Sequence, residues 1–224
     1  MSDLRPGVLF DVDGTLLDTN YLHVLAWWRA FVDTGHGPQP MDRIHRAIGI
    51  PSEGLVRHVL GSEPEDLDEI VEAHSRRYEP LRDDVEPFPR VADLLHTCAD
   101  RGAAVVLATS GKSADLDWMQ PAIGAEDVLA GATTSEDVDE GKPAPDLLTT
   151  AMRDHGLDPT ATVVVGDTVW DVEAAVKAGL PCIGLACGGI SAAELTEAGA
   201  TAVYADPAAL LDAFDDSPLG RITG

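Results

Sequence analysis

The chain has 224 residues, and 45% of them are hydrophobic, which fits one globular domain or a domain with an insertion. Its formal net charge of −24 argues against nucleic acids and anionic membranes as partners. No apolar run approaches the roughly 20 residues of a membrane helix, and residues 1–7 lack an apolar signal core. The three cysteines are scattered and fit neither a disulfide framework nor a zinc-site spacing, so we expect a cytoplasmic protein.

The first predicted strand is short and apolar, and it ends in two carboxylates. Residues 8–10 form this strand, Asp11 and Asp13 follow it, and Gly14 begins a turn. Side chains alternate along a strand, so the two carboxylates share a face only if the backbone stays extended. Such close carboxylates repel each other unless a cation lies between them. The pattern therefore indicates metal-assisted chemistry with a carboxylate nucleophile and an acid/base group.

The segment between residues 16 and 88 contains no convincing strand. Apolar residues recur at helical spacing over residues 23–32, and helix-start signals follow near Ser52 and Ser62. This pattern predicts a helical insertion after the first strand.

After residue 87, apolar runs alternate with amphipathic segments. The predicted strands are 103–108, 128–129, 162–165, 181–185 and 202–204. The predicted helices are 90–101, 116–123, 146–155, 172–178, 194–198 and 207–214. The alternation predicts an α/β fold with a parallel sheet and right-handed crossovers. In such sheets the functional site lies beyond the carboxyl ends of the strands.

Polar segments stand at those strand ends and in one loop. Beside the first pair of aspartates, Thr109-Ser110-Gly111 follows the second strand and Gly166-Asp167-Thr168 follows a later one. A loop with the sequence Gly141-Lys142-Pro143 precedes the helix at Asp146. Their positions predict that these segments converge on one pocket.

Four segments resemble, in order, the four signatures of the haloacid dehalogenase superfamily, best its phosphoglycolate phosphatase and β-phosphoglucomutase-like branch. They are Phe10–Thr15, Thr109–Ser110, Gly141–Asp146 and Gly166–Asp171. The resemblance covers nearly the whole chain. It implies a Rossmann-like parallel sheet core of residues 1–17 and 88–224, with an inserted α-helical cap domain of residues 18–87.

The resemblance also assigns the reacting and metal-binding residues. It implies that Asp11 attacks phosphorus to form an aspartyl-phosphate, and that Asp13 protonates the leaving oxygen and later deprotonates water. Mg²⁺ would bind the Asp11 and Asp167 side chains and the Asp13 carbonyl, with Asp171 supporting it through water.

The phosphate would be held by residues of the second and third signatures. The resemblance implies that Thr109 donates to the phosphoryl group, aided by the Ser110 and Gly111 amides. Lys142 would neutralise phosphate and nucleophile, and Gly14 is expected beside the substrate. Lys112 is better explained as a surface charge than as a phosphate contact.

The insertion contributes further substrate-binding candidates. His23 resembles a mutase-branch histidine that positions the acid/base group, although packing at a helix start would also explain it. Arg46 and Gly49 are candidates for the substrate side of the cap. The mutase branch has an arginine shortly after this glycine, where the chain has Ser52, and Arg46 or Arg57 could replace it.

We therefore expect a Mg²⁺-dependent phosphatase acting on a small phosphorylated metabolite, as a monomer or homodimer. A phosphohexose mutase is the first alternative, and a catalytically silent phosphometabolite-binding protein is the second. Dehalogenation fits poorly because a second aspartate is present at position 13. Phosphonate cleavage fits poorly because no lysine precedes Lys112.

Overall fold

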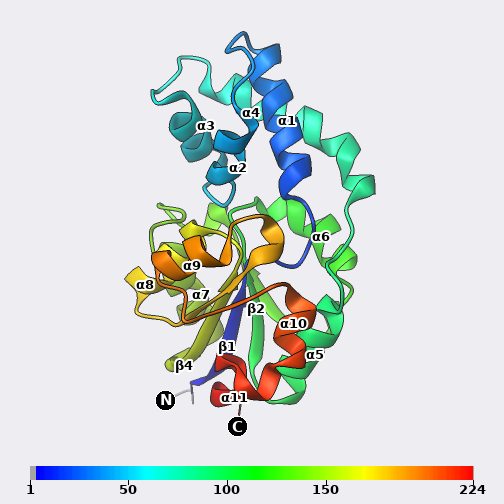
Figure 1. Ribbon diagram of the computed structural model, residues 1–224, viewed down its shortest axis with the longest axis vertical. Coiled ribbons are helices and arrows are strands. Elements are labelled where there is room, and N and C mark those ends of the chain that lie inside the picture. The colour runs from blue at the N-terminus through cyan, green and yellow to red at the C-terminus, as the bar shows by residue number, and fades with distance from the viewer. Residues whose placement is uncertain (1–3, 224) are drawn as a thin grey trace.

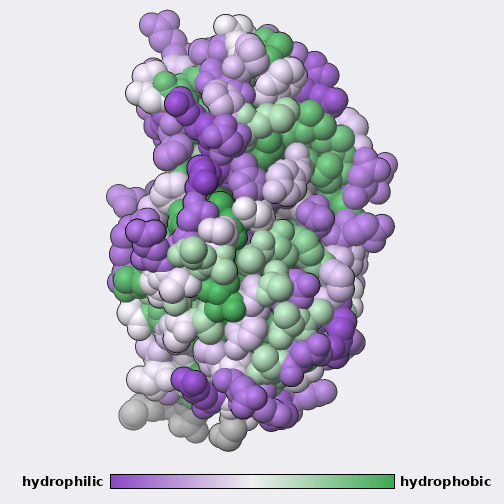
Figure 2. All heavy atoms as spheres, in the orientation of Figure 1, coloured by the Kyte–Doolittle hydropathy of each residue, from purple (hydrophilic) through white to green (hydrophobic). Residues whose placement is uncertain are grey.

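The computed structural model describes residues 4–223 and has two layers. A parallel sheet with helices on both faces forms the larger layer, and a group of helices lies over one end of it (Figure 1). Residues 4 and 223, where the described chain begins and ends, lie at the opposite end of the sheet layer (Figure 1). On the face of the molecule seen in Figure 2, hydrophilic residues lie along most of the edges, which agrees with the high net charge.

Six strands form one sheet in the order β3-β2-β1-β4-β5-β6, and all neighbouring strands are parallel. Their bounds are β1 Arg5–Phe10, β2 Ala104–Ala108, β3 Leu129–Thr133, β4 Leu157–Gly166, β5 Cys182–Leu185 and β6 Ala202–Tyr204. This arrangement confirms the predicted Rossmann-like α/β fold.

The sheet is covered on both faces, which explains the continuous apolar runs of its central strands. In the register of β1, Val8 lies between Val105 of β2 and Val163 of β4. One face packs against α5 (Val91–Asp100), α6 (Leu116–Ile123), α10 (Pro207–Asp212) and α11 (Pro218–Ile222). The other face packs against α7 (Asp146–His155), α8 (Val169–Ala178) and α9 (Ala192–Ala198).

Several element bounds differ from the prediction: β1 begins at Arg5, β3 extends to Thr133 and α8 begins at Val169. Two further differences concern β4 and α11. Strand β4 begins at Leu157, five residues before the predicted start at Thr162. Its first part is largely exposed, and the register with β1 shifts before Thr162, so the apolar run marks only the buried half. Helix α11 has only five residues, too few to show a helical period in the sequence.

The second layer, here called the helical layer, comprises α1 (Asn20–Asp33), α2 (Met41–Ala47), α3 (Ser52–Leu60) and α4 (Leu67–Tyr78). It has a hydrophobic cluster of its own, built from residues such as Trp27, Phe31, Ile44, Val56 and Ile70. The chain enters this layer after β1 and returns through a 3₁₀ helix, Glu79–Asp84, to α5. Within residues 4–223, no helix combines the length and the apolar character needed to cross a membrane.

Candidate active site

The predicted site residues meet at the carboxyl ends of neighbouring strands. Asp11 follows β1, Thr109 follows β2 and Asp167 follows β4, and these strands are adjacent in the sheet. All three residues are buried. The parallel order of the strands thus gathers residues that are far apart in the sequence.

Lys142 lies at the centre of this group although it comes from a loop before α7. Its Nζ is 2.6 Å from Asp11 Oδ1 and 2.6 Å from Asp171 Oδ1, and it donates to the Ala108 carbonyl at 3.0 Å. The side chain is only 2% exposed. Burial lowers the pKa of Lys142, but the attraction of both carboxylates more than offsets this and raises it. The group is therefore an ammonium with two carboxylate partners.

A third buried carboxylate, that of Asp167, lies beside the two partners of Lys142. Oxygens of Asp11, Asp167 and Asp171 lie within 4.8 Å of one another, and all three residues are buried. Burial raises the pKa of Asp11 to about 7, although Lys142 opposes the shift. Burial and the charges of Asp171 and Asp11 raise the pKa of Asp167 well above its ordinary value. The cluster thus carries negative charge that the protein itself does not balance.

The donor set of this cluster fits a hard divalent cation. Thr15 Oγ1 donates to Asp167 Oδ1 at 2.9 Å, and Asn20 Nδ2 donates to Asp167 Oδ2 at 2.8 Å, so this carboxylate is held in one orientation. A Cβ at Gly188 would lie 1.8 Å from Asp167 Oδ2, so only glycine leaves the carboxylate its place. Fixed oxygen ligands of this kind suit Mg²⁺.

Asp171 is positioned by the start of α8. Thr168 Oγ1 accepts from the Asp171 amide at 3.2 Å, and Asp171 Oδ2 accepts from the Thr168 amide at 3.1 Å. This reciprocal capping arrangement fixes the first turn of the helix and the carboxylate together. The other oxygen of Asp171 is left to face Lys142.

Asp13 contacts the helical layer. Its Oδ1 accepts from Thr19 Oγ1 at 2.7 Å and lies 3.2 Å from His23 Nε2 on α1. Burial alone would raise the pKa of Asp13, but the interactions with His23 and Thr19 bring it below its ordinary value. Asp13 and Asp11, one residue apart, therefore differ in acidity because their partners differ.

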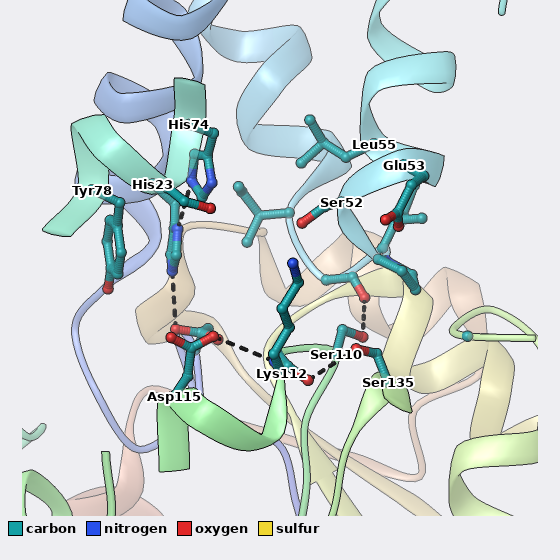
Figure 3. Close-up of a pocket in the computed structure, with 18 of the residues that line it drawn as sticks. His23, Ser52, Glu53, Leu55, His74, Tyr78, Ser110, Lys112, Asp115 and Ser135 are labelled. Atoms are coloured by element: carbon teal, nitrogen blue, oxygen red, sulfur yellow. Dashed lines mark hydrogen bonds and ion pairs between the residues drawn. The ribbon is translucent and has the colours of Figure 1, made fainter. Parts of the chain in front are cut away.

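A cavity of about 490 Å³ lies between the sheet layer and the helical layer. Asp11, Asp13, Ser110 and Gly111 line it from the sheet side. Figure 3 shows its walls, with Ser52 and Glu53 from α3 on one side and His23, His74 and Tyr78 on the other. Thus the two carboxylates after β1 face a cavity large enough for a small metabolite.

Of the other predicted residues, four are buried and are not among the described cavity-lining residues, whereas Ser110 lines the cavity. Thr109, Lys142, Asp167 and Asp171 are buried, and Thr109 Oγ1 accepts from the Gly111 amide at 3.0 Å. Ser110 Oγ donates to the carbonyl of Gly49, a cavity residue of the helical layer, at 2.8 Å.

Two predicted substrate contacts are placed elsewhere. Arg46 is paired with Glu194, 2.5 Å away on the exposed surface, and is not among the described residues that line the cavity, so its role as a substrate contact stays a prediction. The segment after α2, residues 48–51, lines the cavity instead. Gly14 also lies outside the described cavity lining. Its φ of +75° makes the turn after β1, and a Cβ there would strike Asn20 and Asp167.

Sequence reasoning missed several residues at the site. Asn20, which donates to Asp167 and to the Gly188 carbonyl, gives no pattern signal beyond its place after the first signature. Lys112, predicted as a surface charge, is exposed but lines the cavity and points into it (Figure 3). His74 and Tyr78 belong to the apolar face of α4 in the sequence and give no separate sign of a site.

Comparison with known proteins connects this site to a family. The pattern of the haloacid dehalogenase-like hydrolases matches residues 8–185. "Probable phosphatase IndB" of Dickeya dadantii is 30% identical over 95% of this chain and 92% of its own length. Validoxylamine A 7'-phosphate phosphatase of Streptomyces hygroscopicus subsp. limoneus is 30% identical over 79% of this chain and 84% of its own. The crystal structure of a hydrolase from Pseudomonas syringae superimposes with a TM-score of 0.87 at 34% identity, covering 95% of this chain and 99% of the other.

Proposed function

The chain belongs to the haloacid dehalogenase-like hydrolases and is an enzyme of their phosphatase type, and on this premise we propose that it hydrolyses a small phosphomonoester through an aspartyl-phosphate with Mg²⁺ as cofactor. One observation carries the proposal. Asp11 faces the cavity while its Oδ1 is held by the buried ammonium of Lys142. A carboxylate fixed in this way is oriented for attack on a phosphorus atom in the cavity.

In the first step, a carboxylate oxygen of Asp11 forms a bond to phosphorus, and the bond between phosphorus and the ester oxygen breaks. The partners of Asp13 lower its pKa in the free site, and the negative charge of a bound phosphate opposes this shift and favours the protonated form. The protonated Asp13 gives its proton to the departing oxygen, so that an alcohol leaves rather than an alkoxide. In the second step, Asp13 takes a proton from water, whose oxygen attacks the same phosphorus. Inorganic phosphate leaves, and Asp11 returns to its starting form.

The phosphoryl group needs positive partners during these steps. Lys142 supplies one charge from beneath the cavity, and Thr109 with the Ser110 and Gly111 amides supplies hydrogen bonds at the end of β2. Thr109 Oγ1, now bonded to the Gly111 amide, can donate its own proton to a phosphate oxygen.

A divalent cation would be held by the Asp11 and Asp167 side chains and the Asp13 carbonyl, with Asp171 behind them. When bound, it supplies the charge that offsets repulsion among the carboxylates and stabilises the negative charge of the phosphoryl group. The residues of the chain then need only orient phosphate, nucleophile and proton donor.

The rest of the cavity favours hydrolysis over the mutase alternative. A mutase must grip a second phosphate, yet Arg46 is paired with Glu194 outside the cavity. Lys112 faces acidic neighbours in the cavity lining, among them Glu53 and Glu136. Carboxylates accept from hydroxyl and ammonium groups and repel a second phosphate. A phosphorylated polyol or amino sugar therefore suits this wall, and one relative is named for the phosphate of an amine-containing metabolite, validoxylamine A.

The test is phosphate release by the purified protein from a panel of phosphomonoesters, in Mg²⁺ and in chelator. The panel contains 2-phosphoglycolate, fructose 1-phosphate, glucose 6-phosphate, glucosamine 6-phosphate and β-glucose 1-phosphate primed with its bisphosphate. We expect Mg²⁺-dependent release, highest for the sugar and amino sugar esters, and loss of at least about a thousandfold in Asp11→Asn.

Two results would contradict the proposal. Conversion of β-glucose 1-phosphate to glucose 6-phosphate with little free phosphate would establish the mutase. Asp11→Asn with turnover near that of the wild type would exclude a covalent intermediate on Asp11. A direct measurement uses substrate labelled in its phosphoryl group, with the protein denatured shortly after rapid mixing. The label should stay on the wild-type chain as an acyl phosphate and be absent from the Asp11→Asn chain.

A further inference from the structure

The end of α2 meets the sheet layer at the start of α8. Arg46 is the last residue but one of α2, so its carbonyl is among those that a helix leaves without an internal partner. Trp170 lies in the first turn of α8, and its Nε1 donates to this carbonyl at 2.9 Å. The same indole meets the ring of His58 on α3 edge-on, with ring centroids 5.6 Å apart and an interplanar angle of 80°. Trp170 therefore contacts two helices of the helical layer, α2 and α3, which lie over this part of the sheet layer (Figure 1).

The segment after α2, residues 48–51, lies beside this indole and lines the cavity. Gly49 has a φ of +98°, a conformation that favours glycine. A Cβ at Gly49 would lie 2.8 Å from Thr168 Oγ1 and 3.2 Å from Trp170 Cδ1. The backbone at Gly49 therefore packs directly on the start of α8, and a displacement between Trp170 and this segment would move a wall of the cavity.

Two further contacts hold this segment, and they come from residues of the second and third signatures. Ser110 Oγ donates to the Gly49 carbonyl at 2.8 Å, and Gly141 lies so close to Pro51 that a Cβ would strike the proline ring. Ser110 and Gly141 line the cavity, whereas Trp170 is not among the described residues that line it. Trp170 therefore acts on a ligand through the groups that it holds rather than by touching it.

We propose that Trp170 is a positioning residue for the reaction, which holds residues 48–51 over the substrate and so raises the affinity of the cavity for phosphomonoesters. This inference rests on the proposed function, in which a phosphomonoester occupies the cavity. When the indole bond is lost, the bound ester has to order the segment by itself, and this ordering reduces the binding free energy. The groups that react keep their own contacts, so the loss should appear in KM and not in kcat.

Two substitutions separate the hydrogen bond from the ring. Trp170→Phe removes the indole N–H and keeps an aromatic ring near Gly49 and His58, and Trp170→Ala removes the ring as well. Trp28→Phe is the matched control, because Trp28 is a half-buried tryptophan of α1 that packs on the hydrophobic cluster of the helical layer and is not among the described residues that line the cavity. Melting temperatures establish that each variant is folded, and Trp170→Leu replaces Trp170→Ala if the latter is not.

The measurement is kcat and KM for p-nitrophenyl phosphate in Mg²⁺. The leaving group of this ester needs little help from a proton donor, which keeps small shifts of Asp13 out of the result. In Trp170→Phe we expect KM to rise by about fivefold, the usual effect of one hydrogen bond, and kcat to stay within about twofold of the wild type. Trp170→Ala should raise KM by more than about tenfold, and Trp28→Phe should match the wild type in both constants.

His58→Ala tests whether the aromatic contact acts through the indole. An edge-on pair contributes a factor of about two to ten, so His58→Ala alone should raise KM by about twofold. In a Trp170→Ala background the same substitution should leave KM unchanged, because the partner ring is already absent.

A fall in kcat of more than about fivefold in a folded Trp170→Phe would overturn the inference, because the indole would then act on the chemistry through the start of α8. Unchanged kinetics in a folded Trp170→Phe would overturn it as well, as would equal effects of His58→Ala with and without the indole. These outcomes differ from failure of the proposed function, in which the wild type itself releases no phosphate from p-nitrophenyl phosphate and the role of Trp170 falls with it.

Discussion

Replacing Lys142 by methionine tests the electrostatics of the site most directly. Methionine has a similar length and no charge, so it fills the space of the lysine while leaving Asp11 and Asp171 without their cation. Each carboxylate is 2.6 Å from Nζ, which at an effective dielectric constant of about 20 corresponds to about 6 kcal/mol of gross attraction. Desolvation of the ions cancels much of this attraction, so the measurable effect is smaller.

Removal of one partner from a buried ion pair costs about 3–5 kcal/mol, because the remaining charge is left buried. For a chain of this size, a loss of about 3 kcal/mol lowers the melting temperature by about 6–12 °C. The measurement is thermal unfolding at pH 7.5 in chelator and again in Mg²⁺. We expect a smaller loss in Mg²⁺, because a bound cation replaces part of the missing charge.

The control is Lys177→Met on the exposed side of α8. The Lys177 side chain is 48% exposed, lies 3.5 Å from Glu173 and donates to the Pro143 carbonyl at 2.9 Å. The loss of exposed contacts of this kind changes stability by about 1 kcal/mol or less. If Lys142→Met and Lys177→Met have the same melting temperature in chelator, the assignment of Lys142 as the essential counter-charge of the cluster is wrong.

Three further predictions follow from the same geometry. In chelator, the free energy of unfolding of the wild type relative to that of Asp11→Asn should fall as the pH rises from about 4 to about 7, because folded Asp11, with its pKa raised to about 7, keeps a proton that the unfolded chain has lost. Urea unfolding of both proteins at several pH values measures this difference, and a rise across that window would contradict it. Mg²⁺ should raise the melting temperature of the wild type and have little effect on Asp167→Asn, whereas equal shifts in both would place the cation elsewhere. Arg46→Ala should change KM by less than about twofold, because Arg46 pairs with Glu194 on the surface; a tenfold rise in KM would restore it as a substrate contact.

The sequence predicts the sheet well because its strands are buried on both faces. Runs such as Ala104–Ala108 are apolar throughout, and polar residues mark the ends of β1, β2 and β4 where the site lies. The helical layer is harder to predict, since burial of its cluster explains most of its residues equally well. His74 illustrates this limit, because a buried ring on an amphipathic helix looks the same in sequence whether it only packs or also lines a cavity.

Arg46 shows the converse limit of sequence reasoning. Its place shortly before Gly49 suggested a substrate contact, but the orientation of a side chain on α2 depends on how the helix sits on the sheet layer. The Trp170 indole donates to the Arg46 carbonyl at 2.9 Å, and the guanidinium turns to Glu194. Such contacts between layers involve pairs more than a hundred residues apart, which no local pattern encodes.

The charge balance at the site explains how so acidic a protein can bind a phosphate. Asp11, Asp167 and Asp171 with the single ammonium of Lys142 sum to −3 + 1 = −2 when all are ionised. Burial first, and then the repulsion among the carboxylates, raises the pKa values of Asp11 and Asp167. A phosphate dianion brought to such a cluster would be repelled, and a divalent cation in the proposed site would bring the sum to zero. The proposed function therefore relies on the cation for phosphate binding, because both carboxylate partners of Lys142 already use its charge.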